Sequence, residues 1–63
     1  MLLTDLLDIV SSDTNIILYL DGKRIGMCKV YNFPSRHELN QYYGNKVKEV
    51  MPVDILKLEI YLW

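Results

Sequence analysis

The sequence contains one cysteine, Cys28, and one histidine, His37, among its 63 residues. A single cysteine cannot form an internal disulfide, and these two side chains are too few for a structural zinc site. Very small domains often depend on such cross-links or on oligomerisation, because a chain of this length buries only about 60% of its unfolded surface. We therefore expect no metal and no cofactor, and we expect a homodimer to supply the missing stability.

Long apolar runs are also missing. No run approaches the ~20 residues of a membrane-spanning helix, because Asp5 and Asp8 interrupt the N-terminal stretch. That stretch also lacks the basic start of a signal peptide. The sequence has only two prolines and three glycines, while 51% of its residues are hydrophobic, which is the composition of a folded chain. We expect one cytoplasmic domain over residues 1–63, without membrane contact.

Catalytic constellations are absent from the sequence. The segment "HELNQ" resembles the HExxH zinc-protease helix, but Gln41 stands where the second histidine is needed. Cys28 has no histidine near it in sequence, and Asp5 and Asp8 lack the cleft that acid–base chemistry requires. We expect no catalytic residues, and we expect that the protein is not an enzyme.

Hydrophobic periodicity predicts six elements in the order α-β-β-α-β-β. Residues 2–12 have helical spacing, and "NIILYL" and "RIGMCKVY" flank the turn signal "DGK". Residues 35–44 read as a second helix and residues 56–63 as a last strand. Between them, "KVKEVM" reads as a weak strand with either a bulge or a very short pairing. Pro52 should end the weak strand or lie at a sheet edge. The expected fold is a small α+β domain, an antiparallel sheet of about four strands with both helices on one face.

Two local details follow from turn and cap chemistry. Ser35 is the expected N-cap of the second helix, Glu38 completes a capping box, and Gly44 takes the left-handed position that ends it. A two-residue hairpin turn at Asp21 and Gly22 is favoured, whereas a three-residue loop with a bulge would shift the pairing by one residue. The favoured register pairs Leu20 with Lys23, Leu18 with Ile25, and Ile16 with Met27.

The last strand has two unlike faces. Leu56, Leu58, Ile60 and Leu62 point to one side, and Lys57, Glu59, Tyr61 and Trp63 to the other. On the second side the sheet gathers Ile17, Tyr19, Tyr61 and Trp63, an apolar set of the kind that marks an interface. We expect these four residues to contact a second copy or another protein. The alternative is that Trp63 folds over the sheet edge and covers its own core.

Charge is distributed unevenly along the chain. Six of the seven basic residues lie in the segment 23–48, where Glu38 is the only acid, although the net charge is −1. Basic side chains interleaved with aromatic rings can hold single-stranded nucleic acid, so an accessory nucleic-acid-binding protein is the alternative function. The low pI, about 5.6, argues against it. The residues concerned are Lys23, Arg24, Lys29, Arg36, Lys46 and Lys48.

The chain as a whole resembles the very small orphan proteins of bacteriophages and prophages, some of which are anti-defence inhibitors. The resemblance lies in the short length, the α+β plan, the capped mini-helix at residues 35–44 and the strand "ILKLEIYLW". It implies a non-catalytic protein, often dimeric, that occupies a surface of a host protein. It identifies no functional residue.

Overall fold

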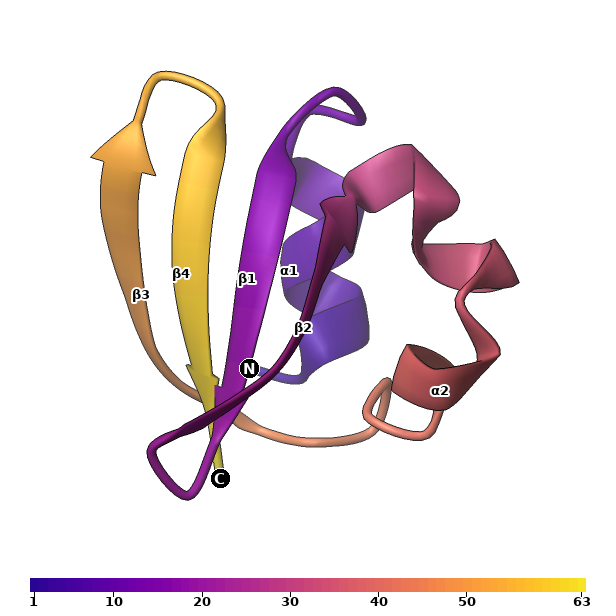
Figure 1. Cartoon of the computed structure of the whole chain (residues 1–63), viewed down its shortest axis with the longest axis vertical. Helices are drawn as coiled ribbons and strands as arrows, with labels where there is room; N and C mark the ends of the chain where they lie inside the picture. Colours follow the sequence, from indigo (N-terminus) through magenta and orange to yellow (C-terminus); the bar gives the residue numbers. More distant parts are fainter.

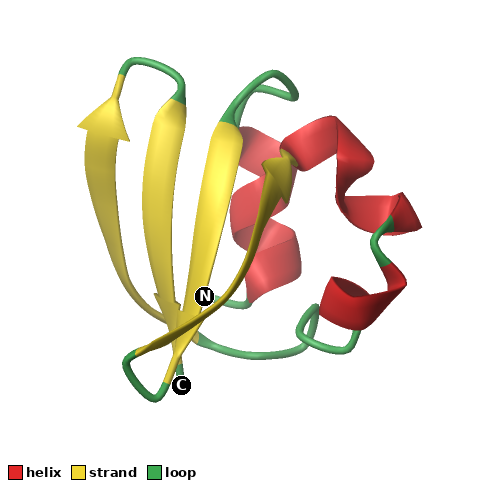
Figure 2. Cartoon of the chain, in the orientation of Figure 1, coloured by secondary structure: helices red, strands yellow, loops and turns green.

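Two β-hairpins lie side by side and form one four-stranded sheet in the computed structural model, which describes all 63 residues (Figure 1). The strand order is β2-β1-β4-β3, and all helices lie on one side of the sheet (Figure 2). The small α+β fold is confirmed, with one 3-10 helix in addition. The elements are α1 (Leu3–Ile9), β1 (Asn15–Leu20), β2 (Lys23–Lys29), η1 (Val30–Ser35), α2 (His37–Asn40), β3 (Val47–Asp54) and β4 (Lys57–Leu62).

The sheet is mixed rather than wholly antiparallel, because β1 and β4 run parallel at its centre. Each hairpin is antiparallel, as expected. The segment between the hairpins, which includes η1 and α2, carries the chain from one end of the sheet to the other (Figure 1). β3 therefore runs in the direction of β2, and β4 returns in the direction of β1.

The core lies between the helices and the inner side of β1 and β4. Ile16, Leu18 and Ile60 are fully buried there, beneath Leu3 of α1 and Phe33 of η1. Leu3 donates its backbone N–H to Asn45 O, and Val47 donates to Met1 O, so α1 is tied to the start of β3. α1 is shorter than residues 2–12, because the backbone is already extended at Val10. No helix is long and apolar enough to span a membrane.

The turn of the first hairpin is confirmed, but the favoured register is wrong beyond it. Asp21 and Gly22 both have positive φ, and Leu20 pairs with Lys23. A bulge between Leu18 and Tyr19 then shifts the ladder by one residue. The observed pairs are Leu18 with Gly26, Ile17 with Met27, and Ile16 with Cys28.

Packing of α2 gives the physical reason for this shift. Leu39 is 1% exposed, and its Cδ2 atom would lie 2.8 Å from a Cβ added at Gly26. The bulge brings the one residue of β2 without a side chain opposite Leu18. Leu39 can therefore close against the sheet where Ile25 would have blocked it.

The predicted caps of the second helix are wrong. Ser35 belongs to η1, where its hydroxyl donates to Asn32 O at 2.9 Å, and α2 begins after Arg36. α2 ends at Asn40, and Gly44 lies in the following turn without a positive φ. Ser35, the expected N-cap, is the last residue of the 3-10 helix that contains Pro34. It therefore does not cap α2, and the predicted capping box with Glu38 does not form.

The weak strand has the expected irregularity. β3 is an edge strand with register shifts between Val47 and Glu49 and between Pro52 and Asp54. Pro52 therefore lies at the sheet edge, as predicted, although the strand continues past it. The first of these shifts leaves Lys48 without a cross-strand partner.

Gly26→Ala should destabilise the protein by about 1–3 kcal/mol, because the new methyl group overpacks the site that Leu39 fills. Urea unfolding followed by circular dichroism would measure the change. Gly44→Ala is the matched control, since an added Cβ there meets no atom within 4 Å. Equal effects of the two substitutions would contradict the role assigned to Gly26.

Candidate protein-binding face

The side of the sheet opposite the helices is covered by no other element (Figure 2). We call it the open face. Because cross-strand partners point to the same side of a sheet, the register arranges it in rows across β2, β1, β4 and β3. The rows are Arg24, Tyr19, Tyr61 and Glu49; then Met27, Ile17, Glu59 and Met51; then Lys29, Asn15, Lys57 and Asp54.

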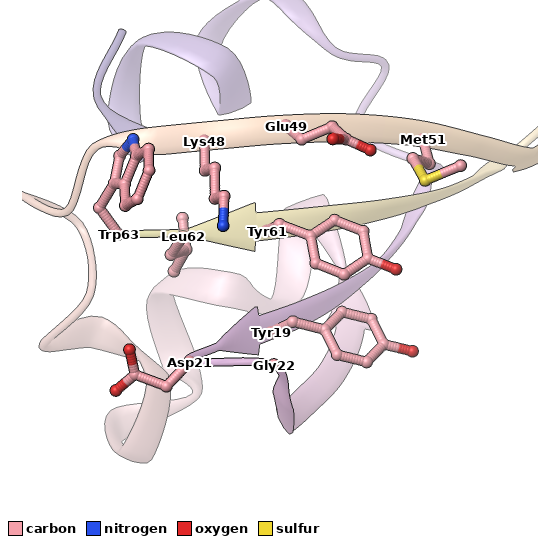
Figure 3. Close-up of a pocket in the computed structure, with 9 residues that line it drawn as sticks. All are labelled: Tyr19, Asp21, Gly22, Lys48, Glu49, Met51, Tyr61, Leu62 and Trp63. Carbon is pink, nitrogen blue, oxygen red and sulfur yellow. The ribbon is translucent and has the colours of Figure 1, made fainter.

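A stacked pair of tyrosines stands at the centre of the open face. The rings of Tyr19 and Tyr61 have centroids 4.7 Å apart and are inclined by 13° (Figure 3). Both hydroxyls donate to the carboxylate of Glu59, Tyr19 to Oε2 at 3.0 Å and Tyr61 to Oε1 at 3.1 Å. One carboxylate thus holds both rings, and its two oxygens are both satisfied.

The same contacts change the acidity of the phenols. The hydrogen bond to Glu59 is the main cause that raises the pKa of Tyr19, because an ionised phenol would lose it and face a like charge. Partial burial is the main cause that raises the pKa of Tyr61, followed by its hydrogen bond to Glu59. Both hydroxyls are therefore protonated donors at neutral pH.

A hollow of about 380 Å³ opens beside the tyrosine pair, at the end of the sheet where β1 and β4 finish (Figure 3). Trp63 forms one wall, and Lys48 Nζ lies 4.7 Å from the centre of its ring. The hollow is lined by Tyr19, Asp21, Gly22, Lys48, Glu49, Met51, Tyr61, Leu62 and Trp63. Rings, a methionine and charges of both signs thus surround one space.

Trp63 is held by its backbone while its ring stays in solvent. Its N–H donates to Lys46 O at 3.0 Å, and its carbonyl accepts from Asn45 Nδ2 at 2.9 Å. The residue nevertheless remains 65% exposed. The ring therefore does not fold over the protein's own core, which was the alternative considered for this residue.

Of the four residues expected to form an interface, three surround the hollow. Tyr19, Tyr61 and Trp63 do so, whereas Ile17 is only 6% exposed and offers little contact surface. The sequence analysis assigned Lys48 only to the alternative nucleic-acid contact and Asp21 only to the hairpin turn, so it placed neither residue at this hollow. Lys48 reaches the open face through the bulge in β3, and the weak alternation of "KVKEVM" was the available signal.

The six basic residues of the alternative function do not gather in one place. Lys23, Arg24 and Lys29 lie on β2, whereas Lys46 and Lys48 lie at the start of β3, on the opposite edge. Arg36 pairs with Glu38 at 2.6 Å on the helical side. The acidic Asp21 and Glu49 share the hollow with Lys48, so its surroundings are mixed in charge.

The one thiol of the chain lies away from the open face. Cys28 faces the helical layer, where burial raises the pKa of its thiol. No three side chains of His, Cys, Asp or Glu gather closely enough to hold a metal ion.

No protein-family model matches the chain, and neither does any curated protein or solved structure.

Glu59→Gln should lower the pKa of Tyr19 towards its ordinary value and lower that of Tyr61 less, because burial is the larger cause for Tyr61. The raised values stabilise the fold fully below about pH 10, and this contribution is lost as the pH rises through them. NMR titration of ring-labelled tyrosine measures both values. Glu49→Gln is the control and should leave Tyr19 unchanged; equal effects on the two tyrosines would contradict the assignment.

Proposed function

We propose that this protein is a non-catalytic protein-binding module that acts through its open face. The observation that carries the proposal is Trp63, whose backbone is fixed at the rim of the hollow while its ring stays exposed beside the stacked tyrosines. Exposed, rigidly presented Trp and Tyr rings are typical of binding hot spots, because they bring large contact area at a low entropic cost.

The edges of the sheet suit a partner less well than the face does. The edge strand β3 carries Pro52, which has no N–H to donate, and it is interrupted by two register shifts. On the other edge, the Met27 carbonyl of β2 already accepts a hydrogen bond from Arg36 Nη1 at 3.1 Å. Addition of a partner's strand is therefore disfavoured, and docking on the open face is favoured.

In this proposal the protein works in the cytoplasm by occupying a surface. It forms a homodimer and binds, and thereby inhibits or modulates, a protein of its host. The direction towards a host protein comes from the resemblance to small phage and prophage proteins. The contact chemistry comes from Tyr19, Tyr61 and Trp63.

Trp63→Ala should weaken association at least tenfold, because it removes the most exposed anchor of the open face. The free energy of unfolding of the monomer should change by only about 0.5 kcal/mol, since the ring is largely in solvent. Sedimentation from micromolar to millimolar concentration measures self-association, and capture from host lysate measures partner binding.

Ile9→Ala is the matched control, because it truncates an apolar residue that is 73% exposed but belongs to α1, on the helical side of the sheet. It should leave both measurements unchanged. The proposal fails if the two variants associate alike, or if Trp63→Ala unfolds the chain.

A further inference from the structure

The open face is polarised from one edge to the other. Its β2 side presents the cations Arg24 and Lys29, and its β3 side presents the anions Glu49 and Asp54. Three strand spacings separate the two sides, which is about 14 Å. Between them, on β1 and β4, lie the tyrosine pair, the nearly buried Ile17, Asn15, Glu59 and Lys57, while Met27 and Met51 lie on the two edge strands.

These rim charges have no charged partner within the chain. Arg36 and Glu38 form its single ion pair. The Arg24 guanidinium donates a hydrogen bond to the Met27 sulfur at 3.8 Å, and the Lys29 ammonium lies 5.9 Å from the centre of the uncharged Tyr31 ring. Glu49 and Asp54 form no ion pair. Each edge of the face is therefore free to form an ion pair with an oppositely charged side chain of another molecule.

The polarisation is self-complementary, and we infer that a second copy of this chain covers the open face, related to the first by a two-fold axis parallel to the strands. Such a rotation lays β2 of one copy over β3 of the other, and β1 over β4. It is an isologous contact, in which every pairing occurs twice. The inference rests on the proposed function and specifies its dimer.

The pairings follow from the rows of the face. Arg24 meets Glu49 of the second copy, Lys29 meets Asp54, and Tyr19 meets Tyr61. An axis perpendicular to the strands would instead lay β2 over β2 and β3 over β3. Arg24 would then face Lys29 and Glu49 would face Asp54, so like charges would meet at both edges. Charge therefore selects the parallel axis.

The centre and the end of the face fit the same arrangement. Glu59 is the charge beside the tyrosine pair, and its two oxygens already accept both phenol hydroxyls, which lowers the cost of covering it. Trp63 follows β4 and Asp21 follows β1 at one end of the sheet. The rotation therefore places the indole over the turn that borders the other copy's hollow.

The size of the face sets the expected strength. Four strands about 4.8 Å apart, with about six residues each, give a footprint of about 20 by 20 Å. That footprint lies at the small end of specific interfaces. We expect the dimer to dissociate with a constant in the micromolar range.

Charge reversal tests the pairing of Arg24 with Glu49. Arg24→Glu and Glu49→Arg should each raise the dissociation constant of the dimer at least tenfold, because each places like charges together twice.

An equimolar mixture of the two variants should form a heterodimer of nearly native affinity. In that heterodimer one contact pairs the two reversed side chains, which are again opposite in charge, and the other keeps the native pair of Arg24 with Glu49. The chain that carries both substitutions should also dimerise again. Sedimentation equilibrium and native mass spectrometry measure these species.

Asp8→Lys is the control, because it reverses an exposed charge on α1, on the helical side of the sheet, and it should leave the dimer intact. Circular dichroism checks that each variant is folded. The inference is overturned if the two reversed variants stay apart when mixed, if either alone dimerises like the native chain, or if the native chain is monomeric throughout. The proposed function has a separate test, because capture of a host protein that depends on Trp63 can persist when the charge pairing fails.

Discussion

Parallel pairing of β1 with β4 determines both surfaces of the sheet. It aligns Leu18 with Ile60 on the inner side and Tyr19 with Tyr61 on the outer side. Because side chains alternate along a strand, one register fixes the core and the tyrosine stack together. A slip of one residue would expose the core residues of one strand and separate the two rings. The open face therefore cannot vary independently of the hydrophobic core beneath it.

Two of the three register shifts in the sheet adapt this regular centre to its surroundings. In β2 the extra residue brings Gly26 beneath Leu39, so that a helix of only four residues can close the core. In β3 the shift after Val47 leaves Lys48 without a cross-strand partner, and its ammonium group lies over the ring of Trp63. Both bulges lie in edge strands, where the lost ladder bonds cost least, while β1 and β4 stay regular between them.

The sequence predicts what is local. Helical spacing, the turn at Asp21 and Gly22, and the two-sided last strand can all be read from neighbouring residues. The parallel pairing of β1 with β4 and the bulge beside Gly26 depend on contacts with distant parts of the chain. Local sequence patterns do not reveal such contacts. Glu59 is an example: in the sequence it is one of two charges beside aromatic residues, and only the fold makes it the acceptor for both tyrosines. The predicted N-cap at Ser35 is wrong for a local reason. The capping motif is present in the sequence, but the 3-10 helix around Pro34 includes Ser35.

The proposed binding would be linked to folding in so small a protein. Only 11 of its 63 residues are buried, and Met27, Met51 and Trp63 remain exposed on the open face or its rim. A partner that covers these side chains buries apolar surface that the chain cannot bury alone, and a ligand of the native state stabilises it by mass action. The same face that binds would then complete the hydrophobic shielding of the sheet. In the proposed complex the centre of the face can be covered at low cost, because the Glu59 carboxylate is satisfied and, apart from Lys57, the unpaired charges lie at the two edges.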